Sequence, residues 1–550
     1  MKLNKNYIQT FIFILVYLFA IYFWSQPFHD KKLPYGEYDA MSHFQIGDYI
    51  AYNDESFMTL PSYMDIRYGR DNLFKPHTLW YPPTFHTSLG IMEVIGGERI
   101  VPIFLMNTIL ATFIIITSYF VINSLFGFLP AILSSLLIIF SPRDFLPFIW
   151  GQWPERFAYA FIPLILYCLY KYYTSYSKQN SQPIYLYFMS LFLGINMLVH
   201  PTVFFHSLIG IFVLYILLWI KLKKFAFNIK YIIIALLIFL VFFAIFPYQT
   251  GNIFVSFKES SSSGKKELPS LSRLFHWSLD PKDYAGSVPP SYFSFKDMHG
   301  SWTLPFLLLG ILFLFLRREK RDLFLLAWLI SLYLVLHRDM IGIATFLHRS
   351  LSATAHVFAP LTAIGAVYLA SFIKLPKNYG KYLKFAIAIV FVYLVFSVNM
   401  ATASKTLNKE VYNPYTQSGF FTTLNDAEYQ AGQWILENVP QGYNISVLGI
   451  PHNPELLSAT AKKIRWLGAV SQHVTRYFYL VEEEDQIKNH LENFYIMMDY
   501  SMLIPLGNQE PFSSLIKDMQ EFEQSTLKNH TLLYNDNENH IRVYKLETKQ

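Results

Sequence analysis

Long apolar runs alternate with short basic segments through most of the chain, and two longer polar stretches interrupt this pattern. A helix needs roughly 20 apolar residues to cross the hydrocarbon layer of a bilayer. About eleven runs approach that length, centred near residues 8–24, 100–122, 126–141, 157–172, 184–199, 203–221, 230–247, 301–316, 322–336, 352–373 and 383–400. The third, fourth and ninth are short. The pattern predicts an α-helical polytopic membrane protein.

The composition favours the same class of protein. Of the 550 residues, 53% are hydrophobic and 15% are charged, whereas a soluble protein carries about a quarter charged residues. The first apolar run follows Lys2 and Lys5 as a signal peptide would, but no small-residue cleavage site follows it. We expect this run to be an uncleaved first span.

Basic residues in the short loops predict the orientation, because cytoplasmic loops carry an excess of Lys and Arg. When eleven helices are threaded alternately, the basic clusters fall on one side: Lys2, Lys5, Lys171, Lys178, Lys221, Lys223, Lys224, Lys230, Arg317, Arg318, Lys320, Arg321, Lys374, Lys377 and Lys381. That side is predicted to be the cytoplasm, and the N-terminus lies on it. Residues 1–400 then form the transmembrane domain. Outside lie a first loop at 26–98, a lid-like loop at 248–300 and a tail at 401–550.

Charge and cysteine content narrow the classes of function. The tail holds 12 Lys and Arg against 18 Asp and Glu, whereas the whole chain has a formal net charge of +6. The positive balance therefore belongs to the inner loops, and it indicates membrane topology rather than binding to nucleic acid. The one cysteine, Cys168, lies inside a predicted span. A disulfide within the chain or a cysteine-based metal site is not expected.

The tail is long enough for one small domain with its own core. Apolar residues recur at helical spacing over residues 426–438, with Asp426 as a possible cap. Apolar segments at 445–450, 495–498 and 541–546 are typical of buried strands. We expect a small C-terminal extracytoplasmic α/β domain that packs over the outer face of the helices.

The first outer loop concentrates acid, imidazole and aromatic groups, although most connections between spans are short. Asp39 and His43 stand four residues apart and would share one face of an interfacial helix over residues 39–51. Asp39 could act as a general base or hold a divalent cation, while His43 could orient it or share the proton. A helix cap is the plainer alternative for Asp39. His86, just before the second span, needs a polar partner and is a candidate for lining a site.

The outer segment at residues 141–156 supplies a second group of candidates. Arg143 and Arg156 could bind phosphate, and Asp144 or Glu155 could assist a metal or an acceptor. The alternative is that these acids and bases only form salt bridges with one another.

Two more candidates face the same predicted side. His200 ends the fifth span, and Arg349 lies near the start of the tenth. Charges at membrane depth are costly and usually paired, so Arg349 is a candidate for holding an anionic lipid head group. Such a contact would stabilise a departing phosphate.

Together these short motifs resemble the GT-C superfamily of polytopic glycosyltransferases, and more closely its poorly characterised bacterial and archaeal members. The matching segments span most of the chain and are Tyr38-Asp39 with His43, Tyr81-Pro82-Pro83 with His86, Pro154-Glu155-Arg156-Phe157, His200-Pro201 and Ala431-Gly432-Gln433-Trp434-Ile435-Leu436. The resemblance implies a GT-C-like fold with a catalytic aspartate in the first outer loop. It also implies an outer-face site and a polyprenyl-phosphate-linked sugar donor that enters between helices. Asp39 is the aspartate that matches.

Two departures from related enzymes leave the substrates open. The chain has no Trp-Trp-Asp-Tyr-Gly element of the kind found in oligosaccharyltransferase catalytic subunits. Its Asp54-Glu55 doublet lies later than the doublet that directly follows the first span in protein mannosyltransferases. Donor sugar and acceptor are therefore not carried over. A divalent cation, Mg²⁺ or Mn²⁺, held by Asp39, Asp144 or Glu155, also stays open.

The sequence thus predicts an inverting membrane glycosyltransferase that moves a sugar from a polyprenyl-phosphate-linked donor to a cell-envelope glycan, lipid or protein. Its partners would be these substrates and membrane lipids, without nucleic acid. The expected catalytic residues are Asp39 and His43, and the expected donor or substrate contacts are Arg349, Arg156, His86, His200, Asp144 and Glu155. A transporter or flippase would need polar groups along a whole path across the bilayer, whereas here they collect on one side. A non-catalytic scaffold for envelope assembly is the third alternative.

Overall fold

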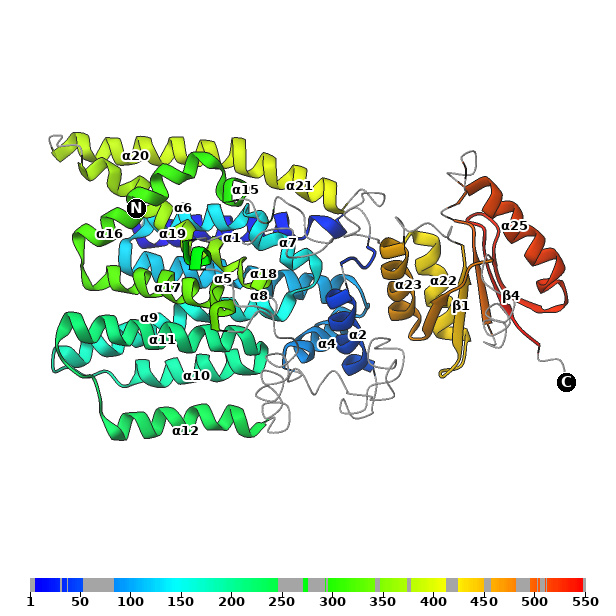
Figure 1. Ribbon diagram of the computed structural model, residues 1–550, viewed down its shortest axis with the longest axis horizontal. Coiled ribbons are helices and arrows are strands. Elements are labelled where there is room, and N and C mark those ends of the chain that lie inside the picture. The colour runs from blue at the N-terminus through cyan, green and yellow to red at the C-terminus, as the bar shows by residue number, and fades with distance from the viewer. Residues whose placement is uncertain are drawn as a thin grey trace.

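The helices of the chain form a bundle with a small α/β domain at one end. This computed structural model describes residues 5–29, 32–36, 38–52, 84–245, 271–275, 292, 295–341, 347–372, 377–411, 424–449, 457–480, 495–501, 503–504, 510 and 512–547. Figure 1 shows the longer helices running side by side, with the α/β domain beyond one set of their ends. We call these ends the domain end of the bundle. A helical membrane domain followed by a small C-terminal α/β domain is confirmed.

The long apolar helices make up the body of the bundle. They are α1 (Lys5–Trp24), α5 (Val101–Phe126), α6 (Phe128–Ile139), α9 (Phe161–Ser177), α10 (Ile184–Val199), α11 (Pro201–Leu222), α12 (Ile229–Ile245), α16 (Leu304–Arg317), α17 (Lys320–Leu336), α19 (Ala353–Phe372) and α20 (Lys377–Leu394). The last of these continues through a π-helical stretch, η8 (Val395–Met400), into α21 (Ala401–Val411).

Shorter elements gather at the domain end. They are η1 (Gln26–Phe28), α2 (Tyr38–Tyr52), α4 (Thr84–Gly96), α7 (Pro142–Trp150), α8 (Trp153–Tyr159), η4 (Leu271–Phe275), α15 (Phe295–His299), η6 (Ser301–Thr303), η7 (Arg338–Ile341) and α18 (Leu347–Ser350). The helix expected over residues 39–51 is present as α2. Most of the expected lid-like loop at 248–300 lies outside the described residues.

The bundle is that of a multi-pass membrane protein. Among the described helices, four are long and apolar enough to cross a bilayer alone, namely Lys5–Trp24, Val101–Phe126, Pro201–Leu222 and Tyr382–Leu407. Helices α6 and α7 together pass the same test but are bent by 47°. The other apolar helices are shorter. The number of eleven spans and the orientation of the termini stay predictions.

Two glycines allow α16 and α19 to approach each other closely. A Cβ on Gly365 would lie 1.9 Å from the carbonyl oxygen of Phe306, and one on Gly310 would lie 2.0 Å from that of Leu361. Without a hydrophobic force between helices in lipid, such backbone contact at small residues is a main source of helix association. The two glycines therefore fix how α16 packs on α19.

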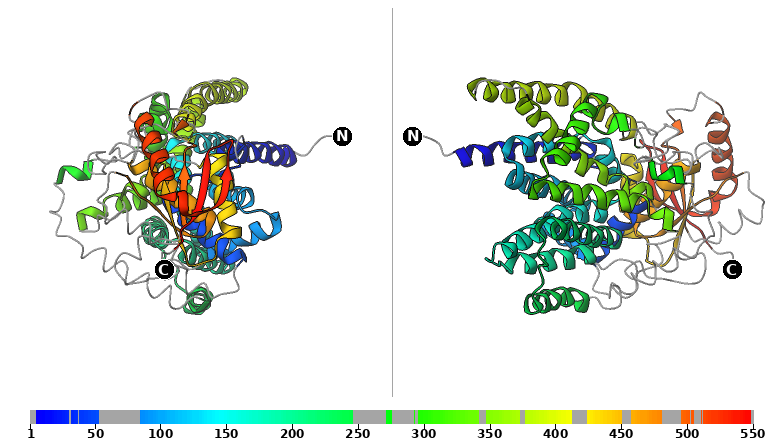
Figure 2. Two further views of the ribbon diagram at one scale, coloured as in Figure 1. Left: turned by 90° about the vertical axis from the view of Figure 1, so that its right-hand side faces the viewer. Right: turned by 60° about the vertical axis from the view of Figure 1, so that its left-hand side comes forward.

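The C-terminal domain is a five-stranded sheet with helices on both faces. Its elements are α22 (Asp426–Asn438), β1 (Asn444–Leu448), α23 (Leu457–Ser471), β2 (Val474–Tyr477), β3 (Tyr495–Asp499), α25 (Phe512–Ser525), η10 (Leu527–Asn529), β4 (Thr531–Asp536) and β5 (Ile541–Lys545). The strand order is β2-β1-β3-β5-β4, in which β1 pairs in parallel with β2 and β3, and the other pairs are antiparallel. Helices α22 and α23 cover the face toward the bundle, and α25 covers the other face (Figures 1 and 2).

The sequence located part of this domain. The helix at 426–438 and the strands represented by β1, β3 and β5 were expected, whereas β2 and β4 were not. The expected cap was wrong by one residue, because Asn425 caps α22 and exchanges hydrogen bonds with Glu428 in a capping box.

Polar contacts join the C-terminal domain to the first loop. Arg99 donates to both carboxylate oxygens of Asp48 on α2 at 2.6 Å and to the carbonyl of Val470 on α23 at 2.9 Å. Gln472 also donates to Asp48 at 2.8 Å. Trp466 donates its indole N–H to the carbonyl of Gly36 at 2.9 Å. The C-terminal domain therefore contacts the chain both at Gly36, just before α2, and at Asp48 within α2.

A second carboxyl group is buried beside this junction. Glu93 on α4 is fully buried, and burial followed by the negative charge of Asp48 raises its pKa to about 10. Glu93 therefore carries a proton at neutral pH in the folded protein, whereas an exposed glutamate is ionised.

Replacing Gly365 by Ala is expected to loosen the bundle by about 1–3 kcal/mol, because the new methyl group would overlap the Phe306 carbonyl. The midpoint of thermal denaturation in detergent should fall. The matched control is Gly380→Ala in α20, since a Cβ there meets nothing within 4 Å. Equal midpoints for the two variants would contradict the close packing of α16 on α19.

Glu93→Gln is expected to stabilise the protein increasingly as pH rises. Because the folded pKa lies above the unfolded value of about 4.3, the wild-type group contributes stability that declines as pH rises toward the folded pKa. Glutamine stays neutral without taking up a proton. The difference in denaturation midpoint between variant and wild type should therefore grow between about pH 5 and about pH 9. Glu437→Gln, which changes an exposed side chain of α22, should show no such trend. A difference in denaturation midpoint between Glu93→Gln and wild type that does not change with pH would contradict the buried protonated state of Glu93.

Candidate functional site

Asp39 lies at the start of α2, where the first loop meets the domain end of the bundle. Its Oδ2 accepts a hydrogen bond from Nη2 of Arg349 on α18 at 2.6 Å. The two side chains are 26% and 24% exposed. The pair therefore joins two segments that are 310 residues apart, and it remains open to solvent.

A close contact with the turn between α7 and α8 positions this end of α2. Gly151 adopts a left-handed conformation with φ of 101°, and a Cβ there would lie 2.0 Å from the backbone nitrogen of Ala40. Only glycine has both the conformational freedom and the small size for this approach. The backbone next to Asp39 is thus fixed against the segment that carries the second group of candidates.

That second group forms a buried ion-pair network. Asp144 on α7 accepts hydrogen bonds from Nη1 of Arg156 at 2.6 Å and from Nε2 of His356 on α19 at 2.7 Å. Arg156 also donates to the hydroxyl of Ser352. All four side chains are almost completely buried. Because a buried charge without a partner is strongly destabilising, each member holds the others in place.

Glu155 and His200 connect the open pair to the buried network. Glu155 accepts a hydrogen bond from the hydroxyl of Tyr159 at 3.0 Å and interacts electrostatically with Arg349. Glu155, Arg349, Arg156 and Asp39 are among the groups that interact electrostatically with His200. The expected residues on α8, on α18 and between α10 and α11 therefore belong to one charged site that opens at Asp39.

The two expected histidines of the first loop are in direct contact. Nδ1 of His43 lies 2.8 Å from Nε2 of His86, and the ring of Trp153 lies 6.1 Å from that of His43 between centroids. Both histidines are buried. His43 lies one helical turn after Asp39 on the same helix. The site therefore has an imidazole pair next to its carboxylate.

The three acids that the sequence left open as metal ligands each contact a donor group of the protein. Among the described residues, no group of three or more His, Cys, Asp or Glu side chains could hold an ion. Asp39 accepts a hydrogen bond from Arg349, and Asp144 accepts one from Arg156. Glu155 accepts one from the hydroxyl of Tyr159. Whether one of these acids also binds a divalent cation stays a prediction.

The sequence analysis assigned no role to three members of the site. Ser352 and Tyr159 carry no signal that separates them from ordinary polar residues near a helix end. His356 was a stronger signal, because it stands alone near the start of an apolar helix, where an ionisable side chain needs a partner. That partner, Asp144, is 212 residues earlier in the chain.

The sequence matches one family over most of its length. The family is described as "Family of unknown function (DUF6541)", and the match covers residues 8–493. The chain belongs to this family. No curated protein is significantly similar to it in sequence.

Solved structures show the same fold at low sequence identity. The apo oligosaccharyltransferase of Archaeoglobus fulgidus has a TM-score of 0.54 at 13% identity, with 92% of this chain and 71% of that chain covered. The structure of the same enzyme tethered to an acceptor peptide with the NVT sequon has a TM-score of 0.54 at 16% identity. It covers 91% of this chain and 70% of that chain. Apo ArnT from Cupriavidus metallidurans has a TM-score of 0.51 at 10% identity, with 98% of each chain covered. The GT-C fold predicted from the short motifs is confirmed.

Removing Asp144 or Arg156 alone is expected to cost on the order of 3–5 kcal/mol of stability, since either change leaves a buried charge unpaired. Asp144→Asn, Arg156→Gln and the double variant, compared by thermal denaturation in detergent, should show strong coupling. The partly exposed pair of Arg321 and Glu319 provides the double-mutant cycle for comparison, with an expected coupling below about 1 kcal/mol. Additive effects for Asp144 and Arg156 would argue against the buried network.

Proposed function

We propose that the protein is a glycosyltransferase that moves a sugar from a polyprenyl-phosphate-linked donor to an acceptor at the outer face of the membrane. The observation that carries this proposal is the contact between Asp39 and Arg349 at the open edge of a buried charged site. A carboxylate and a guanidinium side by side supply a proton acceptor and a phosphate-binding group. The GT-C fold supports the same class of reaction.

Arg349 is assigned to the phosphate of the donor. Its planar guanidinium can bind phosphate through two N–H groups, and its Nη2 contacts Asp39 in this structure. As the bond between sugar and phosphate breaks, negative charge grows on the phosphate oxygen, and a fixed cation stabilises that charge. Binding of the phosphate would also draw Arg349 away from Asp39 and leave the carboxylate free to accept a proton.

Asp39 is assigned as the general base of a single inverting displacement. The acceptor hydroxyl oxygen attacks the anomeric carbon of the sugar, and the bond from that carbon to the phosphate oxygen breaks. The lipid phosphate leaves with the bonding electron pair, and the acceptor proton moves to Asp39. His43, held by His86, lies one turn further along α2 and is assigned to orient the carboxylate or share this proton.

The buried network is assigned a positioning role. Arg156 directs two of its N–H groups to Asp144 and Ser352, so we assign it to contribute positive potential to the site and not to contact the donor directly. Glu155 and His200 lie between this network and the open pair and would line the donor sugar. None of these assignments uses a metal ion, although the sequence left a divalent cation open.

The proposal places the domain end outside the cell and the N-terminus in the cytoplasm, in line with the basic clusters at the other ends of the helices. A cell-envelope glycan, lipid or protein with a hydroxyl group would reach Asp39 from that side. The donor would enter laterally from the bilayer.

Asp39→Asn is expected to lower the rate of transfer by about 10²-fold or more, because the amide keeps the shape of the side chain but cannot accept the proton. The purified protein in lipid nanodiscs is incubated with a panel of polyprenyl-phosphate sugars and candidate acceptors, and release of polyprenyl phosphate is measured by mass spectrometry. Asp426→Asn, at an exposed position of α22, is the control and should keep the wild-type rate.

Two results would count against this function. Transfer by Asp39→Asn at the wild-type rate would remove Asp39 as the base. Movement of a lipid-linked sugar across a vesicle membrane by wild-type protein, without formation of a glycosidic bond, would favour a transporter.

A further inference from the structure

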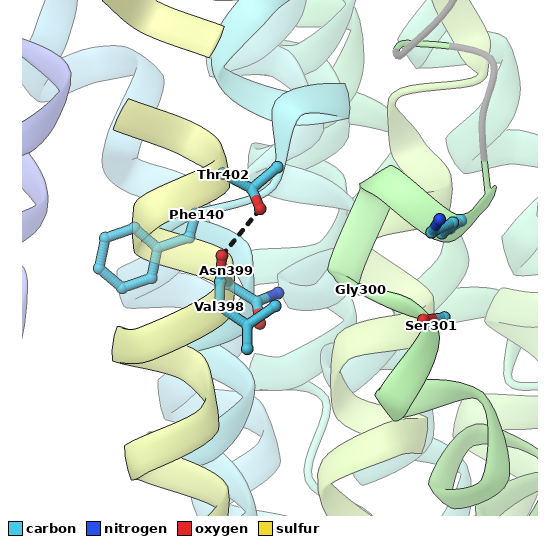
Figure 3. Close-up of a pocket in the computed structure, with 7 residues that line it drawn as sticks. Phe140, Gly300, Ser301, Val398, Asn399 and Thr402 are labelled. Atoms are coloured by element: carbon cyan, nitrogen blue, oxygen red, sulfur yellow. Dashed lines mark hydrogen bonds between the residues drawn. The ribbon is translucent and has the colours of Figure 1, made fainter. Parts of the chain in front are cut away.

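A separate cavity lies on the flank of the bundle where η8 and the start of α21 pass α15 and η6. It has a volume of about 100 Å³, and the described residues that line it are Phe140, Lys296, Gly300, Ser301, Val398, Asn399 and Thr402. Figure 3 shows Asn399 and Thr402 on one segment and Gly300 and Ser301 on the other, with the space between them. The cavity is large enough for several water molecules or a small polar head group.

The π-helical stretch η8 builds the inner wall of this cavity. A π-bulge adds one residue to a helical turn and often marks a functional site. Here Asn399 is turned inward, where its Nδ2 donates to the carbonyl of His299 at 2.7 Å and its Oδ1 accepts from the indole of Trp302 at 3.0 Å. The Asn399 amide therefore holds the segment that carries Lys296 and Ser301 against η8.

The polar groups at the mouth of the cavity suit an anion. Lys296 and Ser301 are both exposed, and no acidic residue is among the described residues that line the space. No described carboxylate pairs with the Lys296 ammonium group. A lysine and a hydroxyl that face a common space are ordinary donors to a phosphate group.

The surroundings of the cavity are apolar and face outward. Val398 is 39% exposed beside it, and Leu304 and Leu308 of the neighbouring α16 are 41% and 59% exposed. On α20, the side chains of Ile389 and Tyr393 are likewise exposed. In a membrane protein such surfaces contact acyl chains, so an anion here would sit where the head groups of lipids meet the hydrocarbon layer.

Helix α15 contacts both this cavity and α7, the helix that carries Asp144 of the buried network. On the inner side, buried Met298 contacts Arg143 of α7, which also donates to the hydroxyl of Thr354 at 3.0 Å. Lys296, two residues earlier, lines the cavity instead. We infer that this cavity binds the phosphate head group of an anionic phospholipid of the bilayer, at a site distinct from the one proposed for the glycosyl donor.

Binding of phosphatidylglycerol to the purified full-length protein tests this inference. Retained lipid is measured by native mass spectrometry after titration with phosphatidylglycerol, for wild type, Lys296→Gln and Lys296→Arg. The matched control is Lys230→Gln, which removes an exposed lysine from the opposite end of the bundle. Parallel arms contain inorganic phosphate as a competitor, or polyprenyl phosphate in place of phosphatidylglycerol.

Lys296→Gln is expected to weaken phosphatidylglycerol binding about fivefold, because one lysine near a membrane surface contributes about that factor. Lys296→Arg and Lys230→Gln should bind as wild type does, and inorganic phosphate at the same concentration should not compete. Equal binding by Lys296→Gln and wild type would overturn the inference. Displacement of the lipid by inorganic phosphate would also overturn it, because the site would then bind a soluble anion. Binding that depends on Lys296 only with polyprenyl phosphate would overturn it as well, because the cavity would then belong to the donor.

Discussion

The pairing of buried charge at the domain end is the constraint on which the arrangement of this bundle depends. Asp144, Arg156 and His356 lie in an apolar interior, where each charge is tolerable only with its partners. Their contacts hold α7, α8 and α19 in one geometry. The turn between α7 and α8 in turn touches the backbone of Ala40 through Gly151, so the same network fixes the start of α2 and the carboxylate of Asp39.

Features with a local cause could be predicted from the sequence. Helix α2 follows from the helical spacing around Asp39 and His43, and α22 follows from its apolar face and its terminal proline and glycine. Strands β1, β3 and β5 are buried and apolar, so they were visible as short hydrophobic runs. Strand β2 has four residues with mixed polarity, and β4 is a largely exposed edge. Neither has the pattern that marks a buried strand.

Features with a long-range cause were only partly accessible. The sequence indicated that Asp39, His86 and Arg349 face one compartment, but not that Asp39 and Arg349 touch or that His43 contacts His86. The contact of Arg99 with Asp48 and α23, which holds the C-terminal domain on the first loop, joins segments up to 371 residues apart. Such pairs have no signature in one sequence, because only the packing of helices brings them together.

The most direct test of the proposed site is a cryo-electron microscopy structure of the protein with a bound polyprenyl-phosphate sugar. We predict that the lipid phosphate lies within hydrogen-bonding distance of the Arg349 guanidinium, that Asp39 and Arg349 no longer touch, and that the anomeric carbon faces the Asp39 carboxylate. A lipid phosphate bound elsewhere, with the contact between Asp39 and Arg349 intact, would contradict the assignment of both residues.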